Sequence, residues 1–268
     1  MDKPINSHVQ IPKAIMKNFS FKEIELNEDN KPVKCDMVYY LDIKCQAVKT
    51  GNIKSLGTIE GYYSPDMEEF LGTRIEGPLG DLMKNAWRFY QDKISQYNIN
   101  DNSVIDFAHY AFLRSKLVLN EVNKPDIVKD FLQSVGYNTE KTQEDLLMHP
   151  EALNGIFDNY VVKVFENHSA VDLVVPRNCI YYMERTSGHM TWFIPFSPRL
   201  AFNLVDKHDA YKFQEGCVLY HDDDELIRKM NRHALECEIR VNNEFIVSKR
   251  MEELEELIPL LHNLKYST

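Results

Sequence analysis

The chain has 268 residues, a mass of 31.4 kDa and a formal net charge of −10. This length can bury a complete core in one large domain or two small ones, and no apolar run approaches the roughly 18 residues of a membrane-spanning helix. The acidic balance disfavours nonspecific capture of DNA or of an anionic membrane, although a local basic groove is compatible with it. Residues 1–8 lack the basic and apolar regions of a secretory signal, so we expect a cytoplasmic protein.

The cysteines disfavour two common uses of this residue. Their number is odd and no two of them form a Cys-x-x-Cys pair, which argues against a disulfide framework and against a zinc knuckle. We expect reduced, mostly buried thiols at all five positions, which are Cys35, Cys45, Cys179, Cys217 and Cys237.

The first 160 residues are predicted to be mainly helical, with one β-hairpin. A short helix is expected to begin at Pro12, because proline suits the first helical position, and the polar residues 21–34 are expected to form a loop. Residues 37–43 are rich in β-branched and aromatic side chains and predict a strand. A turn at residues 50–52 would then lead into a partner strand over residues 53–59.

Several more helices are predicted in this half. Ser64 and Ser103 are each expected to cap one, and Trp87 is expected in the buried stripe of another. Arg114 follows an apolar face, so its guanidinium needs an acidic partner or a path to water. The predicted helices begin at Ser64 and at Ser103 and cover residues 79–97, 127–135 and 142–160.

From residue 161 the pattern changes to short β-rich segments, which predict an antiparallel sheet. The acidic run 222–225 is expected to cap a helix rather than to bind a metal, because consecutive side chains of a helical turn point in different directions. A strand over residues 244–248 and a helix over residues 251–264 close the chain. The predicted strands of the sheet cover residues 161–165, 170–175, 179–183, 190–196 and 199–205.

Together these segments predict an α+β fold, because helices and strands are segregated along the chain rather than alternating. The sequence contains no internal repeat, low-complexity segment or obvious linker, so a single domain over residues 1–268 is expected. This domain would be helix-rich over residues 1–160, strand-rich over 161–220 and helix-strand-helix over 221–268.

The strong catalytic signatures are missing: there is no Walker loop, Gly-x-Gly-x-x-Gly motif, Gly-x-Ser-x-Gly elbow or His-Glu-x-x-His pair. Arg228 and His233 are five residues apart on a predicted helix, a spacing that some helical ribonucleases use for a cation and a general acid/base. The pair is common by chance, and strands here take the place of the helical bundle that normally surrounds it.

A second arrangement would bring His8 together with an acid of the first half and with Ser187 or His189. Histidine and carboxylate could bind a divalent metal or share proton transfer, and Ser187 could orient a phosphate or act as a nucleophile. The alternative is that these side chains only satisfy a turn, and an isolated histidine is more often structural. The candidate acids are Glu60, Glu69 and Glu76.

Residues 183–203 carry the most distinctive pattern, a polar turn followed by a rigid segment framed by Pro195 and Pro198. Thr-Ser-Gly-His-Met at 186–190 and Ile-Pro-Phe-Ser-Pro-Arg at 194–199 are similar to motifs of a family of bacterial and fungal proteins, domain-of-unknown-function family forty-two thirty-eight. Further segments resemble the family in order and spacing over nearly the whole chain: His8-Val9 with Pro12, residues 61–69, 75–76 and 112–115, Asn231, and residues 245–248.

The resemblance implies an intracellular α+β protein and supplies no reaction. Where the family has Asp-Asn-Pro, this chain has Gly188, His189 and Met190, so a carboxylate of the relatives is absent. Either the histidine has taken over a role or the site is inactive.

The sequence thus predicts a polar cleft whose arginine and histidine content suits a phosphate-bearing ligand. The leading hypothesis is a hydrolase acting on nucleic acid or on nucleotide phosphates, and the alternative is a non-catalytic binding or regulatory protein. A metal, a cofactor and the oligomeric state are not specified by the sequence. The catalytic candidates are His8, Arg114, Ser187 and His189, and the substrate-binding candidates are Ser197, Arg199 and Asn231.

Overall fold

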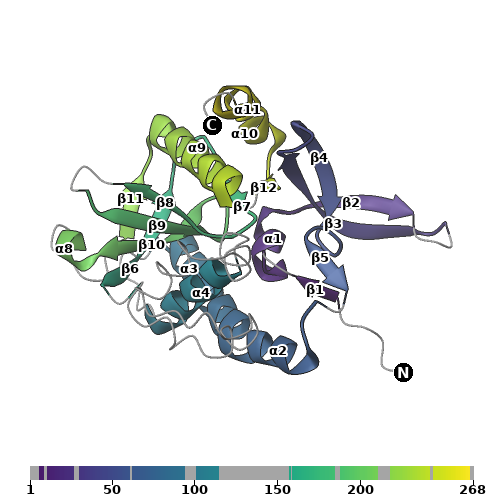
Figure 1. Ribbon diagram of the computed structural model, residues 1–268. Coiled ribbons are helices and arrows are strands. Elements are labelled where there is room, and N and C mark those ends of the chain that lie inside the picture. Colours follow the sequence, from purple (N-terminus) through teal and green to yellow (C-terminus); the bar gives the residue numbers. More distant parts are fainter. Residues whose placement is uncertain are drawn as a thin grey trace, which may run out of the picture.

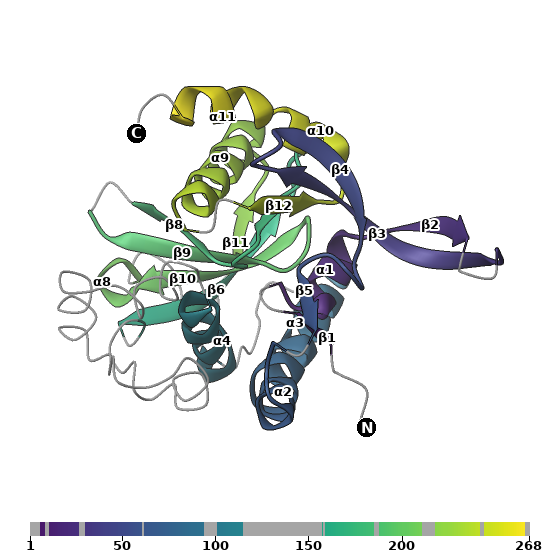
Figure 2. The same cartoon turned by 45° about the vertical axis from the view of Figure 1, so that its right-hand side comes forward.

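The computed structural model describes residues 6–8, 11–26, 30–60, 62–93, 101–114, 157, 159–184, 188–210, 218–241 and 244–265. The predicted α+β class is confirmed: two five-stranded sheets and a two-stranded ribbon combine with helices on both sides of the strands (Figure 1). Figure 2 shows α9, α10 and α11 on one side of the strands and α3 and α4 on the other.

The C-terminal sheet is mixed, which corrects the predicted antiparallel sheet. Its strand order is β11-β6-β10-β9-β8, and β11 runs parallel to β6 while the other neighbours are antiparallel. Strand periodicity says which residues share a face but not which strands become neighbours, so the parallel pair could not be predicted. The strands are β6 (Tyr160–Asn167), β8 (Tyr181–Glu184), β9 (Met190–Pro195), β10 (Leu200–Asp206) and β11 (Val218–His221).

The strand predicted over residues 170–175 is wrong. Only Val175 of this segment enters a strand, β7 (Val175–Pro176), and that strand belongs to the N-terminal sheet. The backbone N–H of Val174 donates instead to the side chain of Asn231, at 3.1 Å. A buried asparagine therefore satisfies backbone groups that a neighbouring strand would otherwise pair.

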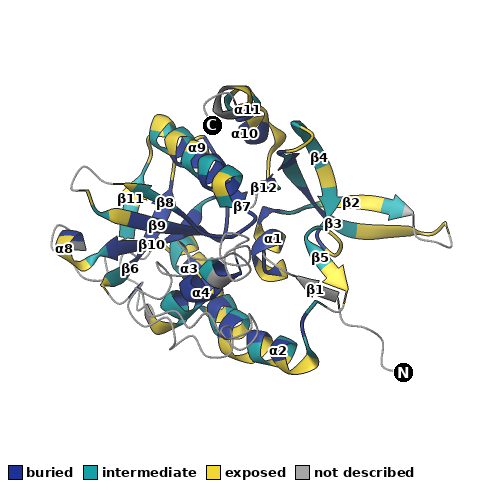
Figure 3. Cartoon of the chain, in the orientation of Figure 1, coloured by how far each residue is buried: buried dark blue, intermediate teal, exposed yellow. Residues whose placement is uncertain are grey.

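The N-terminal sheet joins strands from distant parts of the chain, all in antiparallel pairs. Its members are β2 (Phe21–Leu26), β3 (Pro32–Asp42), β4 (Ala47–Asn52), β7 and β12 (Phe245–Ser248). The predicted loop over residues 21–34 is wrong, because β2 and the start of β3 form a hairpin that projects from the body (Figure 1). Much of this hairpin is exposed (Figure 3), so it lacks the alternating apolar pattern by which strands are identified.

The predicted turn of the next hairpin also lies elsewhere. The chain reverses between Asp42 and Ala47, where Asp42 accepts a hydrogen bond from the backbone of Cys45 at 2.9 Å and Gln46 adopts a φ of 55°. Residues 50–52 therefore belong to strand β4, and the partner strand predicted over 53–59 is replaced by β5 (Thr58–Glu60). Strand β5 pairs with β1 (Asn6–His8) to form the separate ribbon.

Within the described part of the half that was predicted to be helical with one hairpin, the structure has the five strands β1 to β5. The helical segments there are α1 (Lys13–Phe19), α2 (Pro65–Phe70), the π-helix η1 (Leu71–Glu76), α3 (Gly77–Gln91) and α4 (Asp101–Leu113). Ser64 caps α2 by accepting from Met67 N at 3.3 Å, as predicted. Ser103 lies inside α4 and not at its cap, and α3 ends at Gln91 rather than at residue 97.

The helices α2, η1 and α3 follow one another without interruption over residues 65–91. The backbone N–H of Gly77 reaches the carbonyl of Gly72, five residues earlier. A Cβ atom on Gly77 would lie 2.7 Å from that oxygen. Glycine at position 77 is therefore required by the wider π-helical turn.

The C-terminal helices are α8 (Lys207–Ala210), α9 (Asp224–Val241), α10 (Met251–Glu255) and α11 (Ile258–Lys265). The capping role of the acidic run is confirmed, because Asp223 Oδ1 accepts from the backbone of Glu225 at 2.9 Å and of Leu226 at 3.3 Å. The single helix predicted over 251–264 is divided in two, since Pro259 cannot donate the hydrogen bond that a continuous helix would need.

The strands separate two hydrophobic cores. Because alternate residues of a strand face opposite sides, β12 places Phe245 and Val247 in the core with α1 to α4 and Ile246 in the core with α9 to α11. Most positions of β6, β10 and β12 are buried (Figure 3). The turns at the ends of these strands are therefore anchored to well-packed segments.

Some sequence predictions fall partly or wholly outside the described residues. The helix over 127–135 lies outside them, as does nearly all of the helix over 142–160. The four cysteines that the structure describes are free thiols: Cys179 and Cys237 are buried, Cys35 is half-buried and Cys45 is exposed. Within the same ranges, no helix is long and apolar enough to cross a membrane. The single domain stays a prediction.

Candidate functional site

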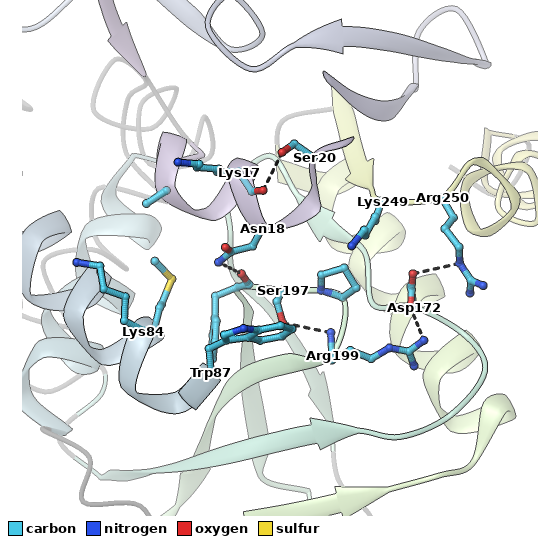
Figure 4. A pocket seen from close by; sticks show the side chains of 15 residues that line it. Lys17, Asn18, Ser20, Lys84, Trp87, Asp172, Ser197, Arg199, Lys249 and Arg250 are labelled. Atoms are coloured by element: carbon cyan, nitrogen blue, oxygen red, sulfur yellow. Dashed lines mark hydrogen bonds and ion pairs between the residues drawn. The ribbon is translucent and has the colours of Figure 1, made fainter. Parts of the chain in front are cut away.

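A pocket of about 750 Å³ lies where α1, α3, the turn after β9 and the segment after β12 meet. This volume falls within the roughly 300–1,000 Å³ of small-molecule sites. We call it the basic pocket, because five cationic side chains and one carboxylate line it. The cations are Lys17, Lys84, Arg199, Lys249 and Arg250, and the carboxylate is Asp172 (Figure 4).

The turn between β9 and β10 forms one wall of the basic pocket and is shaped by Ser197. The hydroxyl oxygen of Ser197 accepts hydrogen bonds from the backbone N–H groups of Arg199, at 3.2 Å, and Leu200, at 2.9 Å. Asn18 of α1 donates to the carbonyl of Phe196 at 2.7 Å and fixes α1 against the same turn. The two predicted substrate-binding residues Ser197 and Arg199 therefore both line the pocket, Ser197 with an oxygen that already accepts two bonds.

Asp172 holds two of the cations in place. Its carboxylate contacts Arg199 Nη2 at 2.8 Å and Arg250 Nε at 3.1 Å. The side chain of Asp172 is 6% exposed, whereas those of Arg199 and Arg250 are 29% and 45% exposed. Arg199 also donates to the carbonyl of Ser169, and Arg250 donates to that of Ala170 and to the carboxylate of Glu253. The loop before β7 thus orients both guanidinium groups at the pocket wall.

Asn231 does not line the basic pocket. It hydrogen-bonds to the backbone of the loop before β7, which carries Asp172. It is buried in α9, where its side-chain oxygen accepts from Val174 N at 3.1 Å and its amide donates to Asp172 O at 2.9 Å. Asn231 therefore positions the loop, because it fixes the backbone on both sides of Leu173, and its predicted substrate-binding role stays a prediction.

Lysines bring further positive charge to the pocket. Lys84 pairs with Asp81 of the same helix at 3.0 Å on the surface. For Lys17 and Lys249, no carboxylate of the described residues lies within ion-pair distance. In the view of Figure 4, Lys17 and Lys84 lie on one side of the pocket and Lys249, Arg199 and Arg250 on the other. An anion entering the pocket would meet cations on both sides.

Trp87 lies between these two groups of cations and is 41% exposed (Figure 4). The sequence placed it in the core, which is wrong. The buried stripe of α3 consists of Leu79, Met83 and Ala86, and a residue next to Ala86 points about 100° away from it. Trp87 therefore stands at the edge of the stripe and turns a large ring face toward the pocket.

Arg114 has no place in this pocket. It is 1% exposed, and its guanidinium lies 3.7 Å from the ring centroid of Tyr110. Burial lowers its pKa, but Tyr110, Tyr63 and Glu76 raise it more, so the net shift is upward. Of the three candidate acids, Glu76 is the one whose charge acts on the pKa of Arg114. We call Arg114, Tyr110, Tyr63 and Glu76 the interior arginine cluster.

Of the remaining catalytic candidates, only His189 has a described side chain, and Arg114 is not among its described partners. His189 Nδ1 lies 3.4 Å from Asp209 Oδ2, and its ring centroid lies 5.8 Å from that of His208. His8 pairs through its backbone with Thr58 in the β1-β5 ribbon, and its side chain lies outside the described atoms. Ser187 also lies outside the described residues. Those members of the predicted cleft whose side chains the structure describes are thus divided between the basic pocket, the interior and the start of β9.

The alternative pair on α9 has separate partners. Arg228 Nε contacts Glu256 at 3.1 Å, and His233 Nδ1 lies 3.3 Å from Glu236. Arg228 thus pairs with the C-cap residue of α10, and His233 pairs within α9. In the parts of the chain that the structure describes, no group of three histidine, cysteine or acidic residues could hold a metal ion.

Several lining residues were missed by the sequence analysis. Lys17 and Asn18 of α1 are 178 or more residues distant from the turn they face, and no local pattern connects them to it. The available signals were a basic pair, Lys249-Arg250, directly after a buried strand, and a tryptophan at the edge of a helical stripe.

Comparison of the chain with protein-family models, with curated proteins and with solved structures finds no match. The resemblance to domain-of-unknown-function family forty-two thirty-eight therefore stays a prediction. Function is inferred below from the pocket itself.

Proposed function

We propose that the basic pocket binds a phosphate-bearing ligand with a flat ring, such as a nucleotide. The observation that carries this proposal is the exposed ring of Trp87 between two groups of cations. Lysine and arginine are the usual partners of phosphate oxygens, and the face of a tryptophan stacks on a base or another planar group. A single carboxylate, Asp172, stands against five lining cations, and two arginines already neutralise it.

Binding without hydrolysis is supported better than the predicted hydrolase. A nucleophile or general base must be available to accept or transfer a proton. Among the described lining residues, Ser197 uses its oxygen to accept two backbone hydrogen bonds, and Asp172 is held by two guanidinium groups. Neither side chain is arranged to attack or to deprotonate a ligand. We therefore favour the non-catalytic alternative, in which the ligand is held and released unchanged.

Tryptophan fluorescence tests this proposal directly. The chain contains two tryptophans, Trp87 and Trp192, so a Trp192→Phe variant reports on Trp87 alone. Titration with adenosine monophosphate is expected to quench this emission, and adenosine without phosphate is expected to bind at least tenfold more weakly. Lys249→Ala should weaken nucleotide binding about tenfold, because a charged hydrogen bond contributes about 1.5–3 kcal/mol.

The matched control is Lys229→Ala, which removes an exposed lysine of α9 that is not among the lining residues and should leave affinity unchanged. Absence of quenching and of calorimetric heat at millimolar nucleotide would exclude the proposal. Phosphate release during the same incubation, abolished by Arg199→Ala, would restore the hydrolase hypothesis.

A further inference from the structure

A row of four aromatic side chains starts at the basic pocket and leads away from it. The ring centroids of Trp87 and Tyr90 are 5.6 Å apart, those of Tyr90 and His168 are 5.3 Å apart, and those of His168 and Tyr220 are 4.1 Å apart. Trp87 and Tyr90 come from one turn of α3, His168 follows β6, and Tyr220 belongs to β11. We call these four rings the aromatic row.

The loop after β6 belongs to both the pocket and the row. His168 contributes a ring to the row, and the next residue, Ser169, accepts a hydrogen bond from Arg199 of the pocket. Further along the same loop, Ala170 and Asp172 contact Arg250. Because Trp87 also lines the pocket, a ligand that fills the pocket already touches the first ring of the row.

The two ends of the aromatic row are left open to solvent. Trp87 is 41% exposed and Tyr220 is 59% exposed, which places both among the most exposed large side chains of the described chain. The ring of His168 is held between them, since Glu166 lies 2.8 Å from its Nε2 atom. His168 and Tyr220 already stack on each other with an interplanar angle of 24°, so the faces open to a base are the exposed ones of Trp87 and Tyr220. Such faces can stack on bases without regard to sequence.

The basic pocket and the aromatic row differ in the sign of the charges around them. The cations gather in the pocket, whereas the acids beside Tyr220 are Asp222, Asp223 and Asp224. Asp223 accepts two backbone hydrogen bonds at the start of α9, and Asp224 accepts one from Ala170 at 2.7 Å. These acids repel phosphate but not the uncharged faces of bases. A bound strand would therefore place one phosphate in the pocket and turn the bases that follow, rather than their phosphates, toward the row.

We propose that the ligand of the basic pocket is a short stretch of single-stranded nucleic acid, with one phosphate in the pocket and the following bases stacked on the aromatic row. This inference rests on the proposed function and specifies its ligand. A duplex does not fit the arrangement, because its bases are stacked on one another and cannot reach the rings. The net charge of −10 also disfavours capture of a duplex by charge alone.

The test compares a nucleotide with oligonucleotides of increasing length. Affinities for adenosine monophosphate and for single strands of two, four and eight nucleotides are measured by fluorescence and calorimetry, in an RNA series and a DNA series. Affinity should rise at least tenfold between the mononucleotide and the four-nucleotide strand in at least one series, and a duplex of the same sequence should bind at least tenfold more weakly than that strand.

Tyr220→Ala separates the row from the pocket. This variant should bind the four-nucleotide strand about tenfold more weakly and the mononucleotide with unchanged affinity, while Tyr220→Phe should bind both normally because the ring is kept. The matched control is Ile24→Ala, which shortens a strand residue on the β2-β3 hairpin that is 66% exposed, against 59% for Tyr220, and should change neither affinity.

The outcomes distinguish this inference from the proposed function. Mononucleotide binding without a gain on lengthening in either series, or equal binding of the duplex, would overturn the single-strand inference and leave the nucleotide pocket standing. Loss of mononucleotide binding in Tyr220→Ala would also overturn it, since the row would then not be separate from the pocket. If neither nucleotide nor strand binds, both proposals fail.

Discussion

The basic pocket and the interior arginine cluster contain the same kinds of side chain in opposite surroundings. Each combines arginine, a carboxylate and an aromatic ring. In the cluster, the fold encloses Arg114, whose guanidinium lies against the ring of Tyr110. In the pocket, Arg250 keeps 45% of its side chain exposed while it contacts Asp172. Because solvent reaches the basic pocket but not Arg114 of the interior arginine cluster, only the pocket can exchange a ligand.

This difference shows that residue type alone does not identify a site. A buried charge loses its hydration and must recover that free energy from partners in the protein. A half-exposed charge keeps part of its hydration, so a ligand can replace water without disturbing the fold. Arg114 was the more conspicuous candidate in the sequence, yet Lys249 and Trp87 are better placed to meet a ligand.

The largest expected effect is a loss of stability when the interior arginine cluster is disrupted. Arg114→Met leaves the carboxyl of Glu76 without its nearby cation, and we expect the free energy of unfolding to fall by about 3–5 kcal/mol. Lys249→Ala in the pocket should change it by less than about 0.5 kcal/mol. Urea unfolding of both variants measures the contrast. Similar losses of unfolding free energy in Arg114→Met and Lys249→Ala would contradict the contrast between a structural cluster and a ligand-accessible pocket.

A smaller effect is expected at the support of the pocket. Asn231→Ala removes the partner of two buried backbone groups, Val174 N and Asp172 O, so the free energy of unfolding should fall by about 1–3 kcal/mol. Nucleotide affinity should fall as well, because Asp172 would no longer hold the two arginines in register. Asn85→Ala, an exposed position of α3, is the control. Reduced stability with unchanged affinity would show that the loop keeps its shape without Asn231.

The smallest expected effect is a pH dependence that belongs to the cluster. Loss of hydration raises the pKa of Glu76 above its ordinary 4.5, and Arg114 opposes this shift only in part. Between 4.5 and the raised pKa, the folded state binds more protons than the unfolded state, so the free energy of unfolding should fall as pH rises through this window. The slope for one proton cannot exceed about 1.4 kcal/mol per pH unit.

Glu76→Gln should flatten this part of the stability profile, and the exposed Glu255→Gln should not. The profiles follow from urea unfolding at a series of pH values. An unchanged slope in Glu76→Gln would mean that the carboxyl keeps its hydration in the folded protein.

Local patterns were sufficient to predict the elements whose apolar faces are regular. The caps at Ser64 and at the acidic run before α9 were predicted because a cap depends only on residues a few positions away. The hairpin of β2 and β3 was missed because much of it faces solvent and has no buried side to set a period. The strand predicted at 170–175 failed because Asn231, far along the chain, pairs its backbone.

The candidate site depended even more on contacts between distant segments. The Pro-Phe-Ser-Pro-Arg turn could be singled out from its prolines, and its residues Ser197 and Arg199 line the basic pocket, while their role in binding stays a prediction. The partners that make it basic, such as Lys17 and Lys249, lie at opposite ends of the chain, and no spacing rule connects them. Trp87 was misplaced by one position around its helix, which is enough to move a side chain from the core to the surface.

The π-helical stretch from Leu71 to Glu76 sets where that tryptophan points. Closing each turn five residues apart rather than four inserts the equivalent of one residue into the helix that runs from Pro65 to Gln91. Relative to an uninterrupted α-helix, everything after Gly77 is rotated by about 100°. This rotation allows α2 and α3 each to turn an apolar face to the core. It also directs Trp87 to the pocket and Tyr90 toward His168.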